Sequence, residues 1–273
     1  METDSLFLKG TGHTVCQDYS TSGSHPGLGI AIVSDGCSMS PQSDVGARLV
    51  AETANSGILD LFGSHPYPLS QTLWGWVEPK LRFIQPHLKL PENALDATLV
   101  AAVASEKDGT LTLFLWGDGH IIYTTRDGTR THIGSKFPSG APYYPSYLLR
   151  KNGPENYREA FGDPLPVIIK TTRAPDGTST EETLAPNPHS RFEVPLADIL
   201  FVCVCSDGIE TFSSPESPDP IPTEEIIGEV TGFKSTAGEF VKRRLLKFQK
   251  NCTKRGWSHY DDISCAAIAF PTP

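Results

Sequence analysis

The stretch IAIVSDG, residues 30–36, decides how the fold of this chain is interpreted. A continuous apolar run of this length is typical of a strand buried on both faces, and here an Asp-Gly pair ends it. The same arrangement occurs in LFLWGDG, residues 113–119, and in LFVCVCSDG, residues 200–208. We therefore predict that the aspartate of each pair is held rigidly at the tip of a core strand.

Three other Asp-Gly pairs have polar neighbours and are predicted to form hairpin turns, because Asp-Gly supplies the positive φ of a tight turn. They lie at Asp108, Asp127 and Asp176. In contrast, YDDISCAAIAF at 260–270 places Asp261 directly before another buried run. Acids gathered at strand ends repel one another, which raises their pKa values or demands cations, and divalent metals with oxygen ligands are the usual solution. The pattern therefore predicts a metal site.

The composition narrows the range of functions. We predict a single domain over residues 1–273, because a chain of this length can form one core. The formal net charge of −9 and the pI of about 5.4 argue against nucleic-acid binding. Six cysteines without a CxxC pair favour reduced thiols in a cytoplasmic protein over a disulfide framework. We expect neither a secretory leader nor a membrane segment, since no run of about 18 apolar residues occurs.

Apolar patterns and turn signals predict the strands. They cover residues 6–9, 28–34, 97–105, 110–116, 121–125, 167–171, 200–206 and 264–270. Hairpin turns imply antiparallel neighbours, and strands buried on both sides need cover above and below. We therefore predict an α+β fold, a four-layer αββα sandwich in which two packed antiparallel β-sheets are flanked by helices.

Three helices are predicted around these strands. The first starts at Ser40, which would cap it, and Pro41 follows at its first position. Its inward stripe consists of Ala47, Val50, Ala54, Ile58 and Leu61. A weaker helix runs over 71–87 with an interruption at Pro79. The third covers 236–252, and we interpret its basic residues as a solvated face instead of a docking patch.

Residues 134–187 form a contrasting region that is dense in Pro, Gly, Tyr and Ser. The region has little periodicity, so we predict an irregular, flap-like insert. Long irregular segments in compact domains are often functional. We expect this insert to shape the choice of substrate.

Six short motifs, in the same order, resemble the metal-dependent protein phosphatases of the type 2C (PPM) family. They are CQDYS at 16–20, VSDGCS at 33–38, DATLVAA at 96–102, WGDGHIIY at 116–123, CSDGIETF at 205–212 and YDDIS at 260–264. Each motif is weak alone, but their shared order is specific. The resemblance runs from about residue 10 to residue 270 and leaves out the insert. Within the family, the chain is more similar to a bacterial branch than to the eukaryotic one.

The resemblance implies two Mn²⁺ or Mg²⁺ ions bound by oxygen ligands. Asp35 would bridge both ions, and the backbone carbonyl of Gly36 would bind the second one. Asp207 and Asp261 would complete the shell of the first ion, and Asp18 would reach the second directly or through water. A water shared by the two ions would attack phosphorus in line, with no covalent phosphoenzyme.

A looser third ion is also implied, with Asp118 as a ligand that shares it with Asp207. The implied catalytic residues are Asp35, Asp207, Asp261 and His13. The alternative for the aspartates is that they only make capping or turn hydrogen bonds.

Several positions differ from the commoner family pattern. His13 stands where many members carry an arginine that binds phosphate, so it would contact phosphate or, alternatively, be satisfied by local hydrogen bonds. Gln17 replaces a frequent glutamate and would be a weaker ligand. Cys37 stands where histidine is frequent, so another group or water must protonate the leaving oxygen, and His120 is one candidate.

Two further residues are predicted to support the ligands. Asp262, in place of a common asparagine, would orient Asp261. Thr98 would stabilise the metal shell through a hydroxyl hydrogen bond, although a β-branched residue needs no function to lie in a strand.

The resemblance implies a serine/threonine phosphoprotein phosphatase that acts on a phosphorylated protein and is paired with a cognate Ser/Thr kinase. We expect a monomer without nucleic-acid or membrane partners. One alternative is a catalytically weak or silent family member that binds phosphoproteins as a regulatory module. Another is an unrelated two-metal phosphoesterase, which would ordinarily show clustered histidine ligands, whereas the eight histidines here are dispersed.

Overall fold

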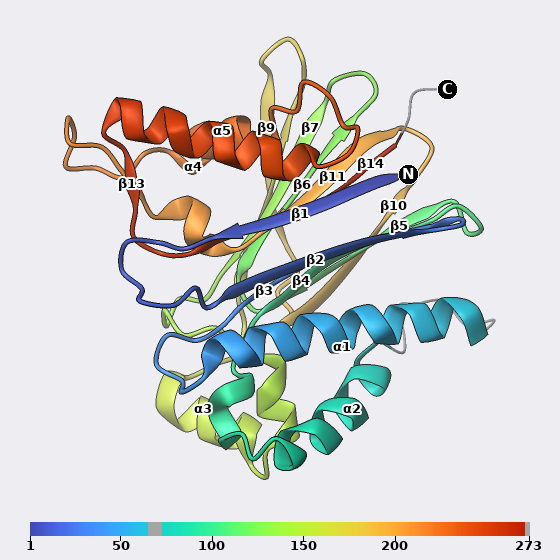
Figure 1. Cartoon of the computed structure of the whole chain (residues 1–273), viewed down its shortest axis with the longest axis vertical. Helices are drawn as coiled ribbons and strands as arrows, with labels where there is room; N and C mark the ends of the chain where they lie inside the picture. The colour runs from blue at the N-terminus through green and yellow to red at the C-terminus, as the bar shows by residue number, and fades with distance from the viewer. Residues whose placement is uncertain (65–72, 271–273) are drawn as a thin grey trace.

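The computed structural model describes residues 1–64 and 73–270, and these residues form four layers (Figure 1). Two antiparallel sheets pack face to face, and helices cover the outer face of each sheet. The predicted α+β sandwich is therefore confirmed.

The smaller sheet has the strand order β10-β5-β4-β3-β2. Its strands are β2 (Asp18–His25), β3 (Leu28–Asp35), β4 (Leu99–Ser105), β5 (Thr110–Trp116) and β10 (His189–Pro195). The larger sheet has the order β1-β14-β11-β6-β7-β8-β9. Its strands are β1 (Glu2–Leu8), β6 (Gly119–Thr125), β7 (Arg130–Lys136), β8 (Val167–Arg173), β9 (Ser179–Leu184), β11 (Ile199–Cys205) and β14 (Ile263–Ala269). A short pair, β12 (Phe212–Ser213) with β13 (Ser258–His259), lies apart from both.

Helices form the two outer layers (Figure 1). On the smaller sheet lie α1 (Ser43–Ser64) and α2 (Leu73–His87), and on the larger sheet lie α4 (Thr223–Thr231) and α5 (Phe240–Arg255). The helix α3 (Gly153–Phe161) lies on the α1 side of the molecule. The described residues also form three 3-10 turns, η2 (Glu92–Leu95), η3 (Pro145–Leu149) and η4 (Asp207–Glu210).

Three apolar cores fill the spaces between the four layers. In β3, Ile30 and Ile32 point into the core between the smaller sheet and the helices α1 and α2. Ala31 and Val33 point into the core between the two sheets. Side chains of β11 alternate in the same way between the core that separates the two sheets and the core between the larger sheet and the helices α4 and α5. This two-sided burial explains why these strands are continuous apolar runs.

The three polar Asp-Gly pairs form the predicted turns. They join β4 to β5, β6 to β7 and β8 to β9. The glycines have positive φ values of 61° at Gly109, 89° at Gly128 and 88° at Gly177. Only a residue without a Cβ adopts this conformation without strain, which is why the dipeptide identifies these turns.

Several strands were not predicted, and three of them lie at the edges of the sheets. These are β2, β9 and β10, which are polar on one or both faces. An edge strand needs fewer apolar residues because one side of it is solvated. The inner strand β7 was also missed, and there buried and half-buried residues alternate along RTHIGSK.

The start of α1 differs from the prediction. The helix begins at Ser43 and not at Ser40, although the predicted apolar stripe is buried. The hydroxyl of Ser40 points instead toward the Asp96 carboxylate, 3.5 Å away, and Gln42 has a φ of 57°. The chain therefore makes a turn at the expected cap before the helix begins.

The other two predicted helices also differ at specific points. The predicted interruption at Pro79 is wrong, because α2 continues through it with Leu73 and Leu81 buried on either side. The expected start of this helix at Gln71 lies outside the described residues. The helix α5 begins at Phe240 instead of Thr236, and its buried face consists of Phe240, Val241, Leu245, Phe248 and Cys252.

The region 134–187 is more regular than predicted. It contains the end of β7, then η3, α3, β8 and β9. The part between β7 and β8, residues 137–166, is called the insert from here on. In the described chain, no helix combines the length and apolarity needed to cross a bilayer.

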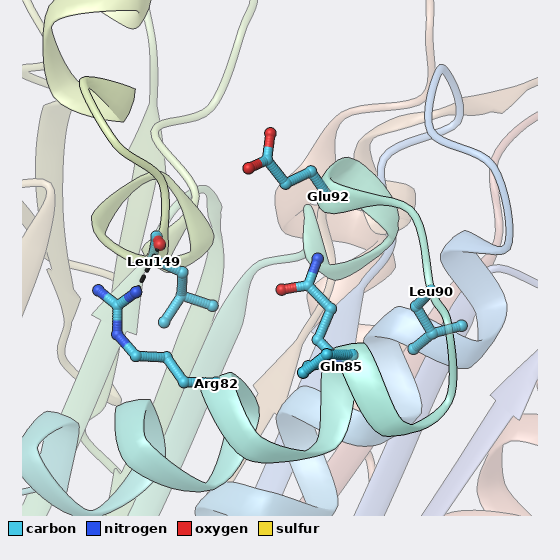
Figure 2. A pocket seen from close by; sticks show the side chains of 6 residues that line it. Arg82, Gln85, Leu90, Glu92 and Leu149 are labelled. Atoms are coloured by element: carbon cyan, nitrogen blue, oxygen red, sulfur yellow. Dashed lines mark hydrogen bonds between the residues drawn. The ribbon is translucent and has the colours of Figure 1, made fainter.

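Asp96 and Arg82 fasten the insert to the sandwich. The buried carboxylate of Asp96, just before β4, accepts a hydrogen bond of 2.5 Å from the Ser146 hydroxyl and pairs with Arg150. From α2, Arg82 donates hydrogen bonds to the carbonyl oxygens of Leu148 and Leu149, and Figure 2 shows the second contact. The insert is thus attached at both the sheet and the helix layer.

Candidate active site

A cleft of about 400 Å³ opens where strand ends of the two sheets meet. Its base is lined by Asp35 at the end of β3, Asp118 between β5 and β6, Asp207 after β11 and Asp261 before β14. Gly36 lines the same base. Residues that are far apart in the sequence therefore converge on one place, as the strand-end pattern predicted.

Asp18 lies beside this base because of strand register. It is the first residue of β2 and the antiparallel partner of Asp35. Its carboxylate Oδ2 accepts a hydrogen bond of 2.6 Å from the hydroxyl of Ser206, which precedes Asp207. This contact links an edge strand of the smaller sheet to β11 of the larger one.

Thr98 fixes the main chain at Asp35. Its hydroxyl accepts a hydrogen bond of 3.0 Å from the Asp35 amide, and its own amide donates to the Asp35 carbonyl at 2.8 Å. The threonine thus holds the ligand-bearing backbone, while the Asp35 side chain faces the cleft.

Burial and mutual repulsion perturb the carboxyl groups. Burial raises the pKa of Asp18 to about 7 and that of Asp207 to about 6, and the Asp261 charge adds to the shift at Asp207. Burial also raises the pKa of Asp35 well above its usual range, and the nearby charges of Asp18 and Asp207 raise it further. The pKa of Asp118 is raised well above its usual range by burial and then by Asp207. Cations bound at the base would remove this penalty.

The donor atoms fit a hard divalent cation. Oδ1 of Asp18, Oδ1 of Asp207 and Oε1 of Gln17 are buried without a hydrogen-bond partner in the described part of the chain. Buried polar oxygens are rarely left unpaired in proteins, so these three are available as ligands. The carboxylate, carbonyl and amide oxygens at the base are the donors that Mn²⁺ and Mg²⁺ prefer, and His13 and Cys37 line the same cleft.

Gly36 lets two neighbouring segments of the chain pack closely against the Asp35 loop. A Cβ at this position would lie 2.5 Å from the Ser43 carbonyl oxygen and 2.9 Å from the Gln17 carbonyl oxygen. No larger residue fits there without moving the backbone. The β2 and α1 segments therefore approach the Asp35 loop closely because this residue is glycine.

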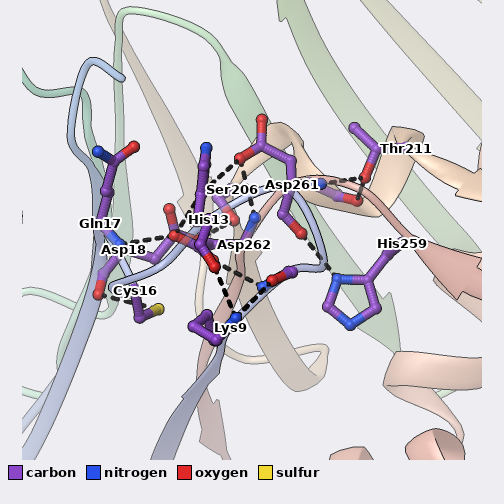
Figure 3. Close-up of polar contacts among 12 residues, drawn as sticks. Lys9, His13, Cys16, Gln17, Asp18, Ser206, Thr211, His259, Asp261 and Asp262 are labelled. Atoms are coloured by element: carbon purple, nitrogen blue, oxygen red, sulfur yellow. Dashed lines mark hydrogen bonds and ion pairs between the residues drawn. The ribbon is translucent and has the colours of Figure 1, made fainter. Parts of the chain in front are cut away.

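Asp262 is buried and holds the loop between β1 and β2 (Figure 3). Its Oδ1 accepts a hydrogen bond of 2.7 Å from the Gly10 amide, and its Oδ2 accepts one of 2.6 Å from the Gln17 amide. Its own amide donates to Oδ1 of Asp261 at 2.8 Å. The carboxylate is thus occupied by amides, and the backbone of Asp262 orients the neighbouring ligand.

His13 belongs to the loop that Asp262 holds. Its Nδ1 lies 2.9 Å from Oδ2 of Asp262 and 3.6 Å from Oδ1 of Asp261 (Figure 3). The ring lines the cleft. This contact with Asp262 fixes the orientation of the His13 ring.

His120 is not placed to act in the cleft. It is buried in β6, where its Nδ1 lies 2.9 Å from Nε2 of His132. Burial lowers the pKa of His120 to about 3, so the ring is neutral near pH 7. The cleft lining includes Cys37 but not His120, so this geometry gives no support to the prediction that His120 protonates the leaving group.

Sequence reasoning missed the residues of the opposite wall. Tyr144, Tyr147 and Phe161 of the insert line it, and Met39 contributes from the loop after β3. The tyrosine-rich composition of the insert was the available signal, but no motif indicated which rings would face the cleft.

The chain belongs to the protein phosphatase 2C family, whose model matches residues 10–249. No curated protein matches the sequence at a significant level.

Solved structures share this fold at low sequence identity. A variant of a bacterial serine phosphatase is 12% identical, with a TM-score of 0.54 and 99% of each chain covered. The serine-threonine phosphatase 2C of Toxoplasma gondii is 11% identical, with a TM-score of 0.52, covering 99% of this chain and 95% of that one. The PP2C domain of SpoIIE from Bacillus subtilis, solved with a fragment of its regulatory domain, is 11% identical, with a TM-score of 0.52, covering 98% of this chain and 63% of that one.

Proposed function

We propose that this protein is a metal-dependent serine/threonine phosphoprotein phosphatase that hydrolyses phosphomonoesters directly. The observation that carries the proposal is the convergence of Asp35, Asp207 and Asp261 on one cleft from three separate strand ends. Membership of the protein phosphatase 2C family supports it.

Two Mn²⁺ or Mg²⁺ ions would be held at the base of the cleft. Their ligands would be Asp35, Gly36, Asp207, Asp261 and Asp18, with a third ion at Asp118. Bound there, the ions would supply an acidified water and offset negative charge on the phosphoryl oxygens. The unpaired Oε1 of Gln17 offers a further, neutral oxygen to the same site.

The chain's own residues would orient the substrate and the ligands. In its protonated form His13 donates from both ring nitrogens, through Nδ1 to Asp262 and through Nε2 to a phosphate oxygen. Asp262 would keep the loop bearing His13 and Gln17 in place, and Thr98 would keep Asp35 in place. Both are positioning residues, since neither would touch the phosphate.

The substrate would be a phosphorylated protein, and a Ser/Thr kinase would supply it. All six cysteines are free, which supports a reducing compartment, and we propose the cytoplasm. A monomeric state stays a prediction.

A silent family member that only binds phosphoproteins is the competing function, because Gln17 and Cys37 depart from the common pattern. One assay separates the two. The purified protein is given a phosphothreonine peptide with and without Mn²⁺, and Asp35→Asn is compared with the wild type. The enzyme reading predicts Mn²⁺-dependent release of phosphate that Asp35→Asn abolishes. Equal release by both proteins, or none by either when Mn²⁺ is shown to be bound, would contradict it.

A further inference from the structure

The cleft has two unlike halves. Every acidic side chain that lines it belongs to the base, namely Asp35, Asp118, Asp207 and Asp261. The opposite half consists of Ser139 to Pro142, Tyr144, Tyr147 and Phe161 from the insert, with Cys37 to Met39 from the loop after β3. Among the described lining residues, this second half carries no charged side chain. A substrate would therefore meet acids and metal ions on one side and an uncharged surface on the other.

The wall has a fixed shape because the insert has its own small core. Phe137, Tyr143 and Tyr157 are buried together in it. The Tyr147 ring stacks on Tyr143 with 5.3 Å between centroids, and the Tyr157 hydroxyl donates to the Ala141 carbonyl at 2.6 Å. Aromatic packing of this kind holds the wall in place before a ligand arrives.

The wall is also fastened to the base of the cleft. Asp96 bonds Ser146 and Arg150 of the insert through its carboxylate, and its carbonyl oxygen accepts a hydrogen bond of 2.8 Å from the Cys37 amide. The Cys37 amide directly follows the Asp35-Gly36 loop. The wall is therefore joined to the Asp35-Gly36 loop through Asp96, which is hydrogen-bonded to Cys37, the next residue of that loop.

Two large apolar side chains of this half remain open to solvent. Phe161 is 45% exposed and Met39 is 91% exposed, and they approach the cleft from different segments. Tyr144, which is almost fully buried, lines the same cleft, and Cys37, Asp35 and Asp118 lie close enough to act on its hydroxyl. Exposed apolar surface that borders a catalytic cleft is typical of a binding surface.

Resting on the proposed phosphatase function, we propose that this half is an apolar subsite that binds an aromatic or large aliphatic side chain next to the phosphorylated residue of the substrate. Phe161, Tyr147 and Met39 are its specificity-determining residues. The flexible thioether side chain of Met39 adapts to side chains of different shape.

Charge favours this occupant over an acidic one. Apart from His13, no cationic side chain lines the described cleft, so an acidic neighbour would find no partner there. The subsite therefore selects against acidic neighbours as well as for apolar ones.

The test uses phosphothreonine peptides that differ only at the residues flanking the phosphothreonine, with Phe, Leu, Ala or Glu on each side in turn. For the wild type with Mn²⁺, kcat/KM for the preferred Phe or Leu peptide should exceed that of the Ala peptide by about tenfold. The Glu peptide should be the poorest substrate. The difference should fall mainly on KM, because the contact is made equally in the ground state and the transition state.

Phe161→Ala and Met39→Ala should each bring the ratio between the apolar and the Ala peptide toward one. Met39 is 91% exposed, so Met39→Ala removes no contact of the core, whereas the Phe161 ring also packs 5.2 Å from the buried Tyr157 ring. Met39→Ala is therefore the cleaner of the two variants. The matched control is Phe83→Ala, since Phe83 is a 65% exposed ring on α2 outside the cleft lining, and it should leave the ratio unchanged. Met39→Lys should specifically improve hydrolysis of the Glu peptide.

The outcomes separate this inference from the proposed function. Hydrolysis of all peptides at the same kcat/KM would overturn the apolar subsite and leave the phosphatase intact. A wild-type preference that survives in both Phe161→Ala and Met39→Ala would overturn the assignment to these residues. Absence of hydrolysis of every peptide with Mn²⁺ bound would overturn the phosphatase and this inference with it.

Discussion

The two halves of the cleft are built in opposite ways. The base is assembled from strand ends of both sheets, and its carboxyl groups raise one another's pKa in addition to the effect of burial. The wall comes mainly from one continuous segment of chain, and its aromatic rings stabilise one another. The comparison shows that the base gathers carboxyl groups whose mutual repulsion bound cations would relieve, whereas the wall is held together by its own aromatic packing.

The base should be far more sensitive to loss of a single oxygen ligand than any other part of the molecule. Asp207→Asn should lower kcat/KM for a phosphopeptide on the order of a thousandfold, because it removes a negative charge that would hold the ions whose charge stabilises the transition state. The matched control is Asp176→Asn, which changes the same kind of Asp-Gly pair in an exposed hairpin turn. Near-normal activity of Asp207→Asn would contradict the distinction between Asp-Gly pairs at the ends of core strands and Asp-Gly pairs in hairpin turns.

Asp262 should show how much the base depends on its supporting loop. Asp262→Ala leaves the amides of Gly10 and Gln17 and the ring of His13 without their acceptor. We expect activity to fall by about 10- to 100-fold and half-saturation to need more Mn²⁺. Asp262→Asn keeps one oxygen acceptor and should fall between this variant and the wild type. A uniform loss of activity at every Mn²⁺ concentration would argue against a positioning role.

The attachment of the wall should matter for stability more than for metal binding. Arg150→Ala leaves the buried Asp96 carboxylate with hydroxyl partners alone and should lower the free energy of unfolding by about 2 kcal/mol. Urea denaturation measures this directly. Arg191→Ala is the control, because Arg191 pairs with Glu193 at the surface and exposed pairs contribute about 0 to 1 kcal/mol. An equal loss of unfolding free energy in both variants would show that the contact between Asp96 and Arg150 does not stabilise the protein more than an exposed ion pair.

The smallest expected effect concerns pH in the metal-free protein. Asp18 and Asp207 have pKa values of about 7 and about 6 when folded, against about 3.9 when unfolded. Their protonated forms therefore stabilise the fold fully below about pH 4, and this contribution is lost as the pH rises through about 6 and about 7. Mn²⁺ replaces those protons, so it should raise Tm by a few degrees more at about pH 7.5 than at about pH 5. Thermal unfolding with and without Mn²⁺ at both pH values tests this.

The sequence predicted the core of the sandwich because its central strands are buried on both faces and read as apolar runs. It did not predict β2, β9 and β10, since edge strands are partly solvated and need no such run. The start of α1 was misplaced because Ser40 is held near Asp96, a contact between residues that are distant along the chain.

Only one half of the candidate site, the base, could be predicted from the sequence. The aspartates could be found because each ends a buried run and lies in a recognisable motif. The wall could not be found, because Tyr147 and Phe161 are positioned by stacking within the insert and by anchors such as Arg150. Contacts of this kind leave no periodic pattern in the sequence.

The central claim is that the converging aspartates bind divalent cations, and calorimetric titration of the metal-free protein with Mn²⁺ tests it most directly. We predict that the wild type binds at least two ions, that Asp35→Asn loses the tight sites, and that Asp176→Asn titrates like the wild type. The account would be contradicted if the wild type bound no Mn²⁺, or if Asp35→Asn bound it with the same stoichiometry and affinity.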